Sequence, residues 1–311
     1  MEGKILFIHA QTSVHPGSGS ALGTIDLPVQ RERHTNWPII PGSSLKGIIR
    51  DACRNRIAIN LKPVDEKSKR KQADENSEIK AVFGPPAVES SEQAGAISIT
   101  DARILLFPVR SLKGVFAWIT CQGVIERLQR DLKLFGETEN FKIKYDKTTA
   151  LVSKTNDNIV SENQIVLEEF DFPVNKSPEV TELAKWIADN VTDDEAIKES
   201  LQKKLVILPD DEFTHFVRYA TQVETRIALN YETKTAVEKA LFYEEFLPPE
   251  TIMYSIILAS EERKEAGKTA QEIIEFISTD FPSILQIGGD ETIGKGFCWV
   301  KLSDGKEVAH E

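Results

Sequence analysis

Short apolar runs of strand length alternate irregularly with amphipathic segments of helical period along this chain. Strand-like runs lie at 4–14, 96–108, 115–120, 253–259 and 285–302, and 150–172 resembles strands joined by polar turns. Apolar residues at helical spacing mark 45–58, 123–134, 179–191, 195–204 and 269–277. This order predicts an α+β fold, with an antiparallel sheet and helices on one of its faces. A small sheet of that kind is a common platform for binding RNA.

Length and composition set the outer limits of what the chain can be. Its 311 residues suffice for one large domain or two small ones, and 41% are hydrophobic, enough for a full core. No apolar run reaches about 18 residues, so no membrane span is expected. The start, Met1 to Val14, is strand-like and lacks a basic leader. Cys53, Cys121 and Cys298 are far apart and form no metal or disulfide pattern, which predicts a cytoplasmic location.

Charge is distributed unevenly between the N-terminal segment and the rest of the chain. The net charge is −11, which argues weakly against nucleic-acid binding. Residues 1–56 hold seven Lys or Arg and four Asp or Glu, a net of +3, so the remainder carries −14. A basic segment on an acidic body suits a local site for a polyanion, although chance produces the same pattern. A mixed-charge run at 62–80 predicts a mobile surface insertion.

The first segment with chemical potential is 41–47, Pro-Gly-Ser-Ser-Leu-Lys-Gly. Ser43 or Ser44 can cap the following helix, and Gly42 allows close approach to its backbone. Free N–H groups at the helix start favour an anion. A cationic stripe follows at four-residue spacing, consisting of Lys46, Arg50 and Arg54. An ordinary capped helix with a solvated basic face explains the pattern equally well, and the spacing of a Walker P-loop is absent.

Two glycine-rich segments are further candidates for contact with a polyanion. The first runs from Gly17 through Gly19 to Gly23, and its spacing excludes a dinucleotide fingerprint because 24–28 cannot open the required helix. The second, 287–297, contains Gly288, Gly289 and Lys295 between apolar strands. Its glycines permit positive φ and close approach of a ligand. On its own, this second segment is better explained as a hairpin turn with a bulge.

Asp26 is the candidate for catalysis. It stands between Ile25 and Leu27, just before a proline, with His9, His15 and His34 nearby in the sequence. A carboxylate in such a place can bind one Mg²⁺ that keeps most of its waters, or can act as a base. The alternative is an aspartate that hydrogen-bonds its own turn, and the residue pattern alone favours that alternative.

Together these segments resemble the RAMP superfamily of CRISPR proteins, and especially the backbone subunit of the type III-B (Cmr) complex. The resemblance is carried by 15–19, 25–35, 38–47, 83–86, 107–114, 241–245 and 288–296, and is weakest over about 135–200. Each motif is moderately specific, whereas their order and combination are very specific. The Leu-Pro-Val-Gln-Arg-Glu-Arg-His-Thr run at 27–35 favours type III-B over type III-A.

The resemblance implies a single RAMP domain over 1–311. It would consist of an RRM- or ferredoxin-like palm with insertions at about 60–95 and 135–205. A projecting β-hairpin, the thumb, is expected within about 205–245. Copies of the subunit would stack along a CRISPR guide RNA in a helical filament, together with other Cmr subunits and away from any membrane.

The resemblance also implies roles for particular residues. Asp26 would support metal-dependent cleavage of the paired target RNA, with Mg²⁺ as the expected ion. Glu244 is the best match to an acidic residue near the thumb base, and His15 is a candidate acid or base. Phe246 stands where the family has a tyrosine, which puts a hydroxyl role there in doubt. The residues expected to bind RNA are Gly17, Gly19, Gly42, Ser43, Ser44, Lys46, Arg50, Gly288, Gly289 and Lys295.

Two other functions stay open at this point. The subunit could be a scaffold that holds the guide while another chain cuts the target. It could also be a RAMP-type endoribonuclease that processes the CRISPR RNA precursor.

Overall fold

A 13-stranded sheet forms the centre of the molecule. The computed structural model describes residues 2–21, 23–61, 65–85, 94–136, 141–145, 147–161, 163–263 and 267–304. The strands of this sheet are β1 (Glu2–Ala10), β2 (Ile39–Ile40), β3 (Ile97–Ile99), β4 (Ala102–Arg110), β5 (Phe116–Cys121), β6 (Ala150–Val152), β7 (Ile159–Ser161), β8 (Gln164–Leu167), β9 (Phe170–Lys176), β10 (Leu205–Leu208), β13 (Ile252–Ala259), β14 (Ile284–Gln286) and β15 (Phe297–Ser303). The helices are α1 (Gly42–Ile59), α2 (Glu66–Asp74), α3 (Ser77–Phe83), α4 (Gln122–Leu132), α5 (Pro178–Val191), α6 (Glu195–Lys204), α7 (Asp210–Tyr219) and α8 (Ala270–Ser278), with short 3₁₀ turns at Lys133–Phe135 and Glu291–Ile293.

Four antiparallel strands lie side by side in the order β15, β1, β13 and β4. Along the chain, β2 and α1 follow β1, and α8 and β14 lie between β13 and β15. The sheet continues through β5, β10, β6, β9, β8 and β7. Among its described strands, the pairs β5–β10 and β6–β9 are parallel. The predicted α+β class with a largely antiparallel sheet is therefore confirmed.

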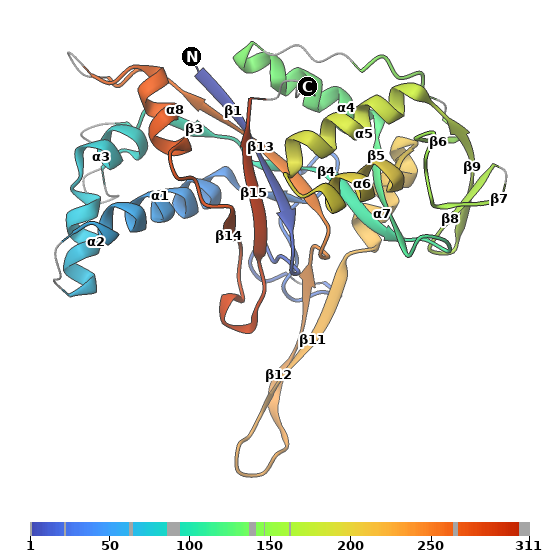
Figure 1. The fold of residues 1–311 in the computed structure, drawn as a ribbon. Coiled ribbons are helices and arrows are strands. Elements are labelled where there is room, and N and C mark those ends of the chain that lie inside the picture. Colours follow the sequence, from blue (N-terminus) through green and yellow to red (C-terminus); the bar gives the residue numbers. More distant parts are fainter. Residues whose placement is uncertain are drawn as a thin grey trace.

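Helices cover both faces of the central strands, so the expected packing on one face is wrong. Neighbouring residues of a strand point to opposite faces, and Leu6 and Phe7 of β1 are both fully buried. The ring of Phe7 meets Trp186 of α5 edge-on at 6.2 Å. On the other side, α1 and α8 lie against the sheet (Figure 1). In the part of the chain that the structure describes, these four strands are therefore buried between two layers of helices.

The described part of the mixed-charge run at 62–80 contains α2 and the start of α3. Asp65 caps α2 by accepting from the Ser68 N–H, and Asn76 caps α3 by accepting from the Glu78 N–H. Ile79 and Val82 of α3 are fully buried in the core. Charge patterning alone did not predict these helices, because the buried apolar residues are few among many charged ones. Residues 62–64 lie outside the described part.

A separate two-stranded sheet extends from the body as a long hairpin (Figure 1). Its strands are β11 (Gln222–Leu229) and β12 (Ala236–Phe246), paired so that Glu224 faces Glu244. The hairpin occupies the later part of the segment 205–245, while β10 and α7 occupy the earlier part. Among the described residues, none of the helices has both the length and the apolar character that crossing a membrane requires.

Candidate nucleic-acid interface

Three segments that are far apart in the sequence meet around one groove. Its volume is about 550 Å³. The lining residues come from the first glycine loop and the two residues before it, from α1 and the extended segment that leads to it, and from the second glycine loop. They are His15, Pro16, Gly17, Gln30, Ile40, Pro41, Ser43, Ser44, Ile48, Gly288 and Gly289. Five of the ten residues expected to bind RNA, Gly17, Ser43, Ser44, Gly288 and Gly289, thus lie together.

The start of α1 is built differently from the expectation. Its N-cap residue is Pro41, which makes no side-chain cap, and Ser43 and Ser44 lie exposed in the first turn. The prediction that a serine caps this helix is therefore wrong. The Gly42 N–H donates to Asp101 Oδ1 at 2.8 Å, so it is not free for a ligand. A Cβ at Gly42 would overlap the Ile99 carbonyl oxygen, which makes this glycine a packing residue.

The cationic stripe on α1 is largely neutralised by other elements. Arg50 Nη2 lies 3.5 Å from Asp74 Oδ1, and Arg54 Nη1 lies 2.9 Å from Asp74 Oδ2, both across the contact with α2. Lys46 Nζ lies 3.5 Å from the Ile97 carbonyl oxygen. Burial, with a smaller effect of Arg50, lowers the Lys46 pKa.

Lys46 also points away from the groove. Ser44 and Ile48 line the groove, and Lys46 lies two residues from each, roughly 200° around the helix. The RNA contacts expected of Lys46 and Arg50 therefore stay predictions, and the geometry gives both side chains other partners.

Asp26 lies on an extended segment that runs beside β12. Its N–H donates to the Tyr243 carbonyl at 3.1 Å, and Leu27 forms a parallel bridge with Glu244. The side chain accepts a hydrogen bond at Oδ2 from the Tyr243 N–H at 2.8 Å. Asp26 is thus pinned to the base of the hairpin, although its neighbours in sequence form a loop.

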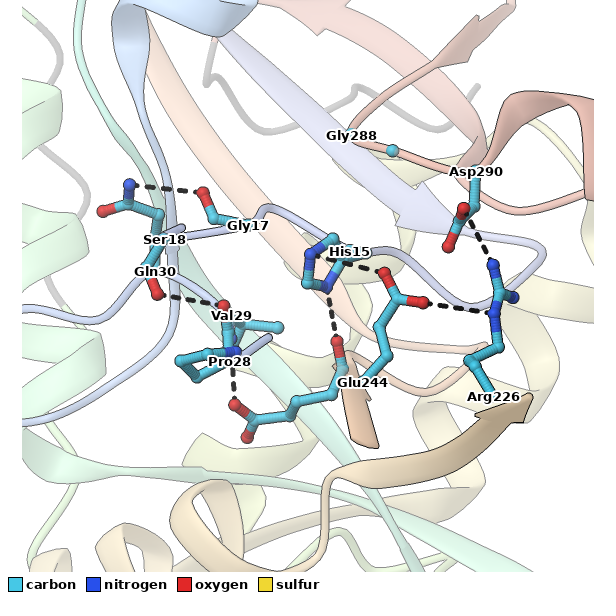
Figure 2. Close-up of polar contacts among 12 residues, drawn as sticks. His15, Gly17, Ser18, Pro28, Val29, Gln30, Arg226, Glu244, Gly288 and Asp290 are labelled. Atoms are coloured by element: carbon cyan, nitrogen blue, oxygen red, sulfur yellow. Dashed lines mark hydrogen bonds and ion pairs between the residues drawn. The ribbon is translucent and has the colours of Figure 1, made fainter. Parts of the chain in front are cut away.

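His15 packs closely between the two glycine loops (Figure 2). Its Nδ1 lies 2.7 Å from the Glu245 carbonyl oxygen, which only accepts, so Nδ1 carries the proton. Its Nε2 lies 3.5 Å from Glu244 Oε1. A Cβ at Gly17 would lie 2.6 Å from Nε2, and one at Gly288 would lie 2.5 Å from the His15 carbonyl oxygen. These two glycines are therefore required for the close packing around His15.

Glu244 is the buried carboxyl of the site, with 4% of its surface exposed. Burial raises its pKa, the negative charge of Asp290 adds to the increase, and His15 and Arg226 oppose it. Arg226 joins the two acids, with Nε 3.5 Å from Glu244 Oε2 and Nη2 3.0 Å from Asp290 Oδ1 (Figure 2). An imidazole and a carboxyl at this distance can hold or exchange a proton.

A metal ion has few protein ligands available here. Among the described residues, no three His, Cys, Asp or Glu side chains come together as a metal site. Asp26, whose Oδ2 already accepts from the Tyr243 N–H, would therefore offer Mg²⁺ a single carboxylate ligand. Mg²⁺ is commonly held in this way, through one or two carboxylates and substrate phosphates.

Two further predicted RNA-binding residues, besides Gly42, Lys46 and Arg50, do not line the groove. Gly19 is exposed with φ of 90°, and a Cβ there would meet nothing within 4 Å. Lys295 forms an ion pair with Glu224, and its Nζ lies 4.6 Å from the centre of the Phe246 ring.

The structure adds Glu245, Arg226 and Asp290 to the site. Glu245 accepts from Arg31 Nη2 at 2.6 Å and from the Val29 N–H at 2.9 Å, so it ties the Asp26 segment to the hairpin. The sequence could have indicated Asp290, which lies inside a glycine-rich segment, and Glu245, which follows Glu244. Nothing in the sequence marks Arg226.

The chain matches known proteins over nearly its whole length. A model described as the RAMP superfamily matches residues 7–299. Over 307 residues the chain is 38% identical to "CRISPR system Cmr endoribonuclease Cmr4" of Pyrococcus furiosus, covering 98% of this chain and 97% of that protein. It is 27% identical to "CRISPR system CMR subunit Cmr4" of Saccharolobus solfataricus, with 94% of each covered.

Solved structures agree with this match. The crystal structure of oligomeric Cmr4 from Pyrococcus furiosus has a TM-score of 0.70 at 33% identity and covers 100% of both chains. A chain in the cryo-EM structure of type III-B Cmr-beta bound to cognate target RNA has a TM-score of 0.72 over 97% of each chain. At 20% identity, that second match shows the fold alone. The sequence and structure matches together establish that this chain belongs to the RAMP superfamily, in its Cmr4 branch.

Proposed function

We propose that this chain is a backbone subunit of a type III-B CRISPR ribonucleoprotein. It holds a segment of guide RNA, cleaves the paired target RNA in a metal-dependent reaction, and assembles with copies of itself and other Cmr subunits. The name of the 38% identical relative, an endoribonuclease, supports this proposal. The observation that carries it is the groove of about 550 Å³, where the three predicted segments converge next to the base of a projecting hairpin.

The strand order supports a palm with a projecting thumb. Strands β1, β4, β13 and β15, with α1 after β1 and α8 before β15, have the βαββαβ order of a ferredoxin- or RRM-like unit. The segments between these strands are then the insertions of one RAMP domain, and β11–β12 is the thumb. The covered faces of the palm support binding of the guide at its loops rather than on the sheet.

The groove suits the backbone of a single RNA strand. Ser43 and Ser44 present exposed hydroxyl groups at the start of a long helix, where the helix dipole favours an anion. Gly17, Gly288 and Gly289 line the groove, so a phosphodiester chain in it would lie against the protein backbone. Such contacts position RNA without reading its sequence, as a guide-binding subunit requires.

The cleavage itself needs few groups from the protein. The 2′-OH of the target attacks the neighbouring phosphorus, the bond to the 5′ oxygen breaks, and the products are a cyclic phosphate and a 5′-OH. A hairpin that separates a base pair would let the 2′ oxygen line up with the phosphorus, and positioning of this kind provides much of such a rate. Asp26 accepts the 2′ proton or holds the ion. Bound there, Mg²⁺ would offset the charge on the phosphate oxygens.

Asp26→Asn in the assembled complex tests the catalytic proposal. Asparagine keeps an acceptor for the Tyr243 N–H but removes the charge, so the segment stays pinned. We expect cleavage of a matched target to fall by about two to four orders of magnitude, with guide and target affinity unchanged. Gel analysis of cleavage and a binding assay on the same preparations measure both quantities. Asp304→Asn, which removes an exposed carboxylate at a distant site, is the matched control.

A scaffold without catalysis is the second candidate. The hydrogen bond from the Tyr243 N–H to Asp26 favours it, because a carboxylate that joins two distant segments in this way can have a purely structural role. Full cleavage by the Asp26→Asn complex would establish the scaffold function. Loss of cleavage together with loss of RNA binding would assign Asp26 a structural role.

A further inference from the structure

One face of β11 is attached to the body of the protein by polar side chains. Alternate residues of a strand point to the same side, and here Gln222, Glu224 and Arg226 turn inward. Val223 and Ile227 point the other way, with 46% and 50% of their surfaces exposed. The base of the hairpin thus has an attached face and a free face.

Each of the three inward side chains has its own partner. Gln222 Oε1 accepts from Ser13 Oγ at 2.8 Å. Glu224 forms an ion pair with Lys295, and Arg226 Nη2 lies 3.0 Å from Asp290 Oδ1. We call these three contacts the β11 ladder. Two of its three contacts end on the second glycine loop, which is far from β11 in the sequence.

The same loop forms one wall of the groove. Gly288 and Gly289 line the groove, and the Gly289 N–H donates to the His15 carbonyl at 3.0 Å. Asp290 follows directly, with φ of 63°, a conformation that costs a residue with a side chain about 1 kcal/mol or more. Its ion pair with Arg226 helps to offset that cost. The wall of the groove and the hairpin are therefore joined by direct contacts between side chains.

Lys295 is the central member of this connection. Its ammonium group is held between the Glu224 carboxylate and the face of the Phe246 ring, and only 17% of its side chain is exposed. An ammonium so enclosed has little freedom to reach a phosphate. Its position therefore disagrees with the role in RNA binding predicted from the sequence.

We infer that Lys295 and Arg226 are positioning residues that fix the angle of the hairpin relative to the groove. This inference rests on the proposed function, since the groove would hold the guide and the hairpin would open the duplex. The β11 ladder then sets which target bond reaches Asp26. A loosened ladder leaves the guide bound but lets cleavage occur at neighbouring bonds.

Charge exchange between Glu224 and Lys295 tests the inference. The variants are Glu224→Lys, Lys295→Glu and the double variant, each prepared as the isolated chain and in the assembled complex. In the isolated chain we expect each single variant to raise amide hydrogen exchange in β11 and β12 by about fivefold or more, and the double variant to return most of the way. In the complex, single variants broaden the length distribution of target fragments, and the double variant narrows it again. Guide affinity stays within about twofold.

Two controls separate this effect from a general loss of stability. Lys203→Glu makes the same change of charge as Lys295→Glu, but in a surface ion pair on α6. It should leave hydrogen exchange in the hairpin unchanged. Glu224→Gln removes one charge without reversing it, and it serves as the test if a charge-reversed variant does not fold. We expect it to raise hydrogen exchange in the hairpin and to broaden the fragment lengths, but by less than Glu224→Lys does. A variant that is only unstable loses activity but keeps its cleavage positions.

Other outcomes would overturn the inference. If Lys295→Glu weakens guide binding and the double variant does not restore it, Lys295 contacts RNA. If the single variants leave both hairpin exchange and fragment lengths unchanged, the β11 ladder does not position the hairpin. If the wild-type complex fails to cut, the proposed function fails, and hydrogen exchange in the isolated chain still decides whether the ladder holds the hairpin.

Discussion

Glu244 is a buried carboxyl that faces three ionisable groups on three different segments. His15 lies just before the first glycine loop, Arg226 is in β11 and Asp290 is in the second glycine loop. Burial and the charge of Asp290 raise the Glu244 pKa above its ordinary value. The unfolded chain therefore ionises this group at lower pH than the folded protein does. As pH rises above the unfolded value, the folded state loses stability relative to the unfolded state.

Glu244→Gln should remove this pH dependence, because glutamine cannot ionise. We expect the melting temperature of the variant, relative to wild type, to increase between pH 5 and pH 8. Thermal unfolding of the isolated chain at both pH values measures this difference. Glu195→Gln, at a side chain with 84% exposure, should give the same difference from wild type at both pH values. A difference for Glu244→Gln that is constant, or that falls toward pH 8, would contradict the prediction.

At the scale of elements, the start of α1 is constrained by its contact with the segment that follows β3. Gly42 lies so close to the Ile99 and Thr100 carbonyl groups that a Cβ has no space, and its N–H is used by Asp101. Gly47, one turn later on the same helix, is exposed and would meet nothing within 4 Å. The two glycines share a helix but differ in their surroundings.

Gly42→Ala and Gly47→Ala should therefore have opposite effects on stability. We expect Gly42→Ala to lower the free energy of unfolding by about 1–3 kcal/mol, because the helix start must move away from the sheet. Gly47→Ala should raise it by up to about 1 kcal/mol, because alanine favours a helix interior. Urea denaturation of both variants measures the change. Equal effects of the two substitutions would mean that Gly42 is not tightly packed.

At the scale of the whole molecule, charge in space differs from charge along the chain. The N-terminal segment has a net charge of +3, yet Arg31 pairs with Glu245, and Arg50 and Arg54 pair with Asp74. Little of that positive charge is free at the surface. Binding of RNA then depends on the local groove and on repeated copies along the strand more than on an overall field.

Copies of the chain should accumulate on a long guide-like RNA in steps of one subunit mass. A contact between different faces of neighbouring copies does not close and forms a helical array. Mass photometry counts the bound copies, and a strictly single copy on a long RNA would contradict the prediction.

For about three phosphate contacts per copy, affinity for a short strand should fall roughly 20-fold between 50 and 200 mM salt. If the Lys46 amine contacts a phosphate, Lys46→Ala should lower the affinity for all RNA sequences about equally. If the amine only donates to the Ile97 carbonyl, the affinity should stay unchanged.

Local sequence patterns determined the class of fold and the position of most elements. The spacing of Leu45, Ile49 and Cys53 predicted α1 because helical residues four apart share a face, and all three are buried. The proline-rich segment before it excluded a helix around Asp26. Family motifs likewise identified the loops that line the groove. All of these signals involve residues close together in the chain.

Only the tertiary structure decided which charges meet. Arg226 and Asp290 are 64 residues apart, and Arg54 and Asp74 are 20 apart. Whether such residues pair depends on strand register, on which helix covers which face and on the direction of each side chain, and none of these is encoded within a few neighbouring residues. For this reason the sequence alone predicted a basic stripe and an RNA-binding Lys295, whereas the fold turned the stripe toward Asp74 and Lys295 toward Glu224. Burial decided the state of Glu244 in the same way, since a carboxyl's pKa depends on the segments packed around it.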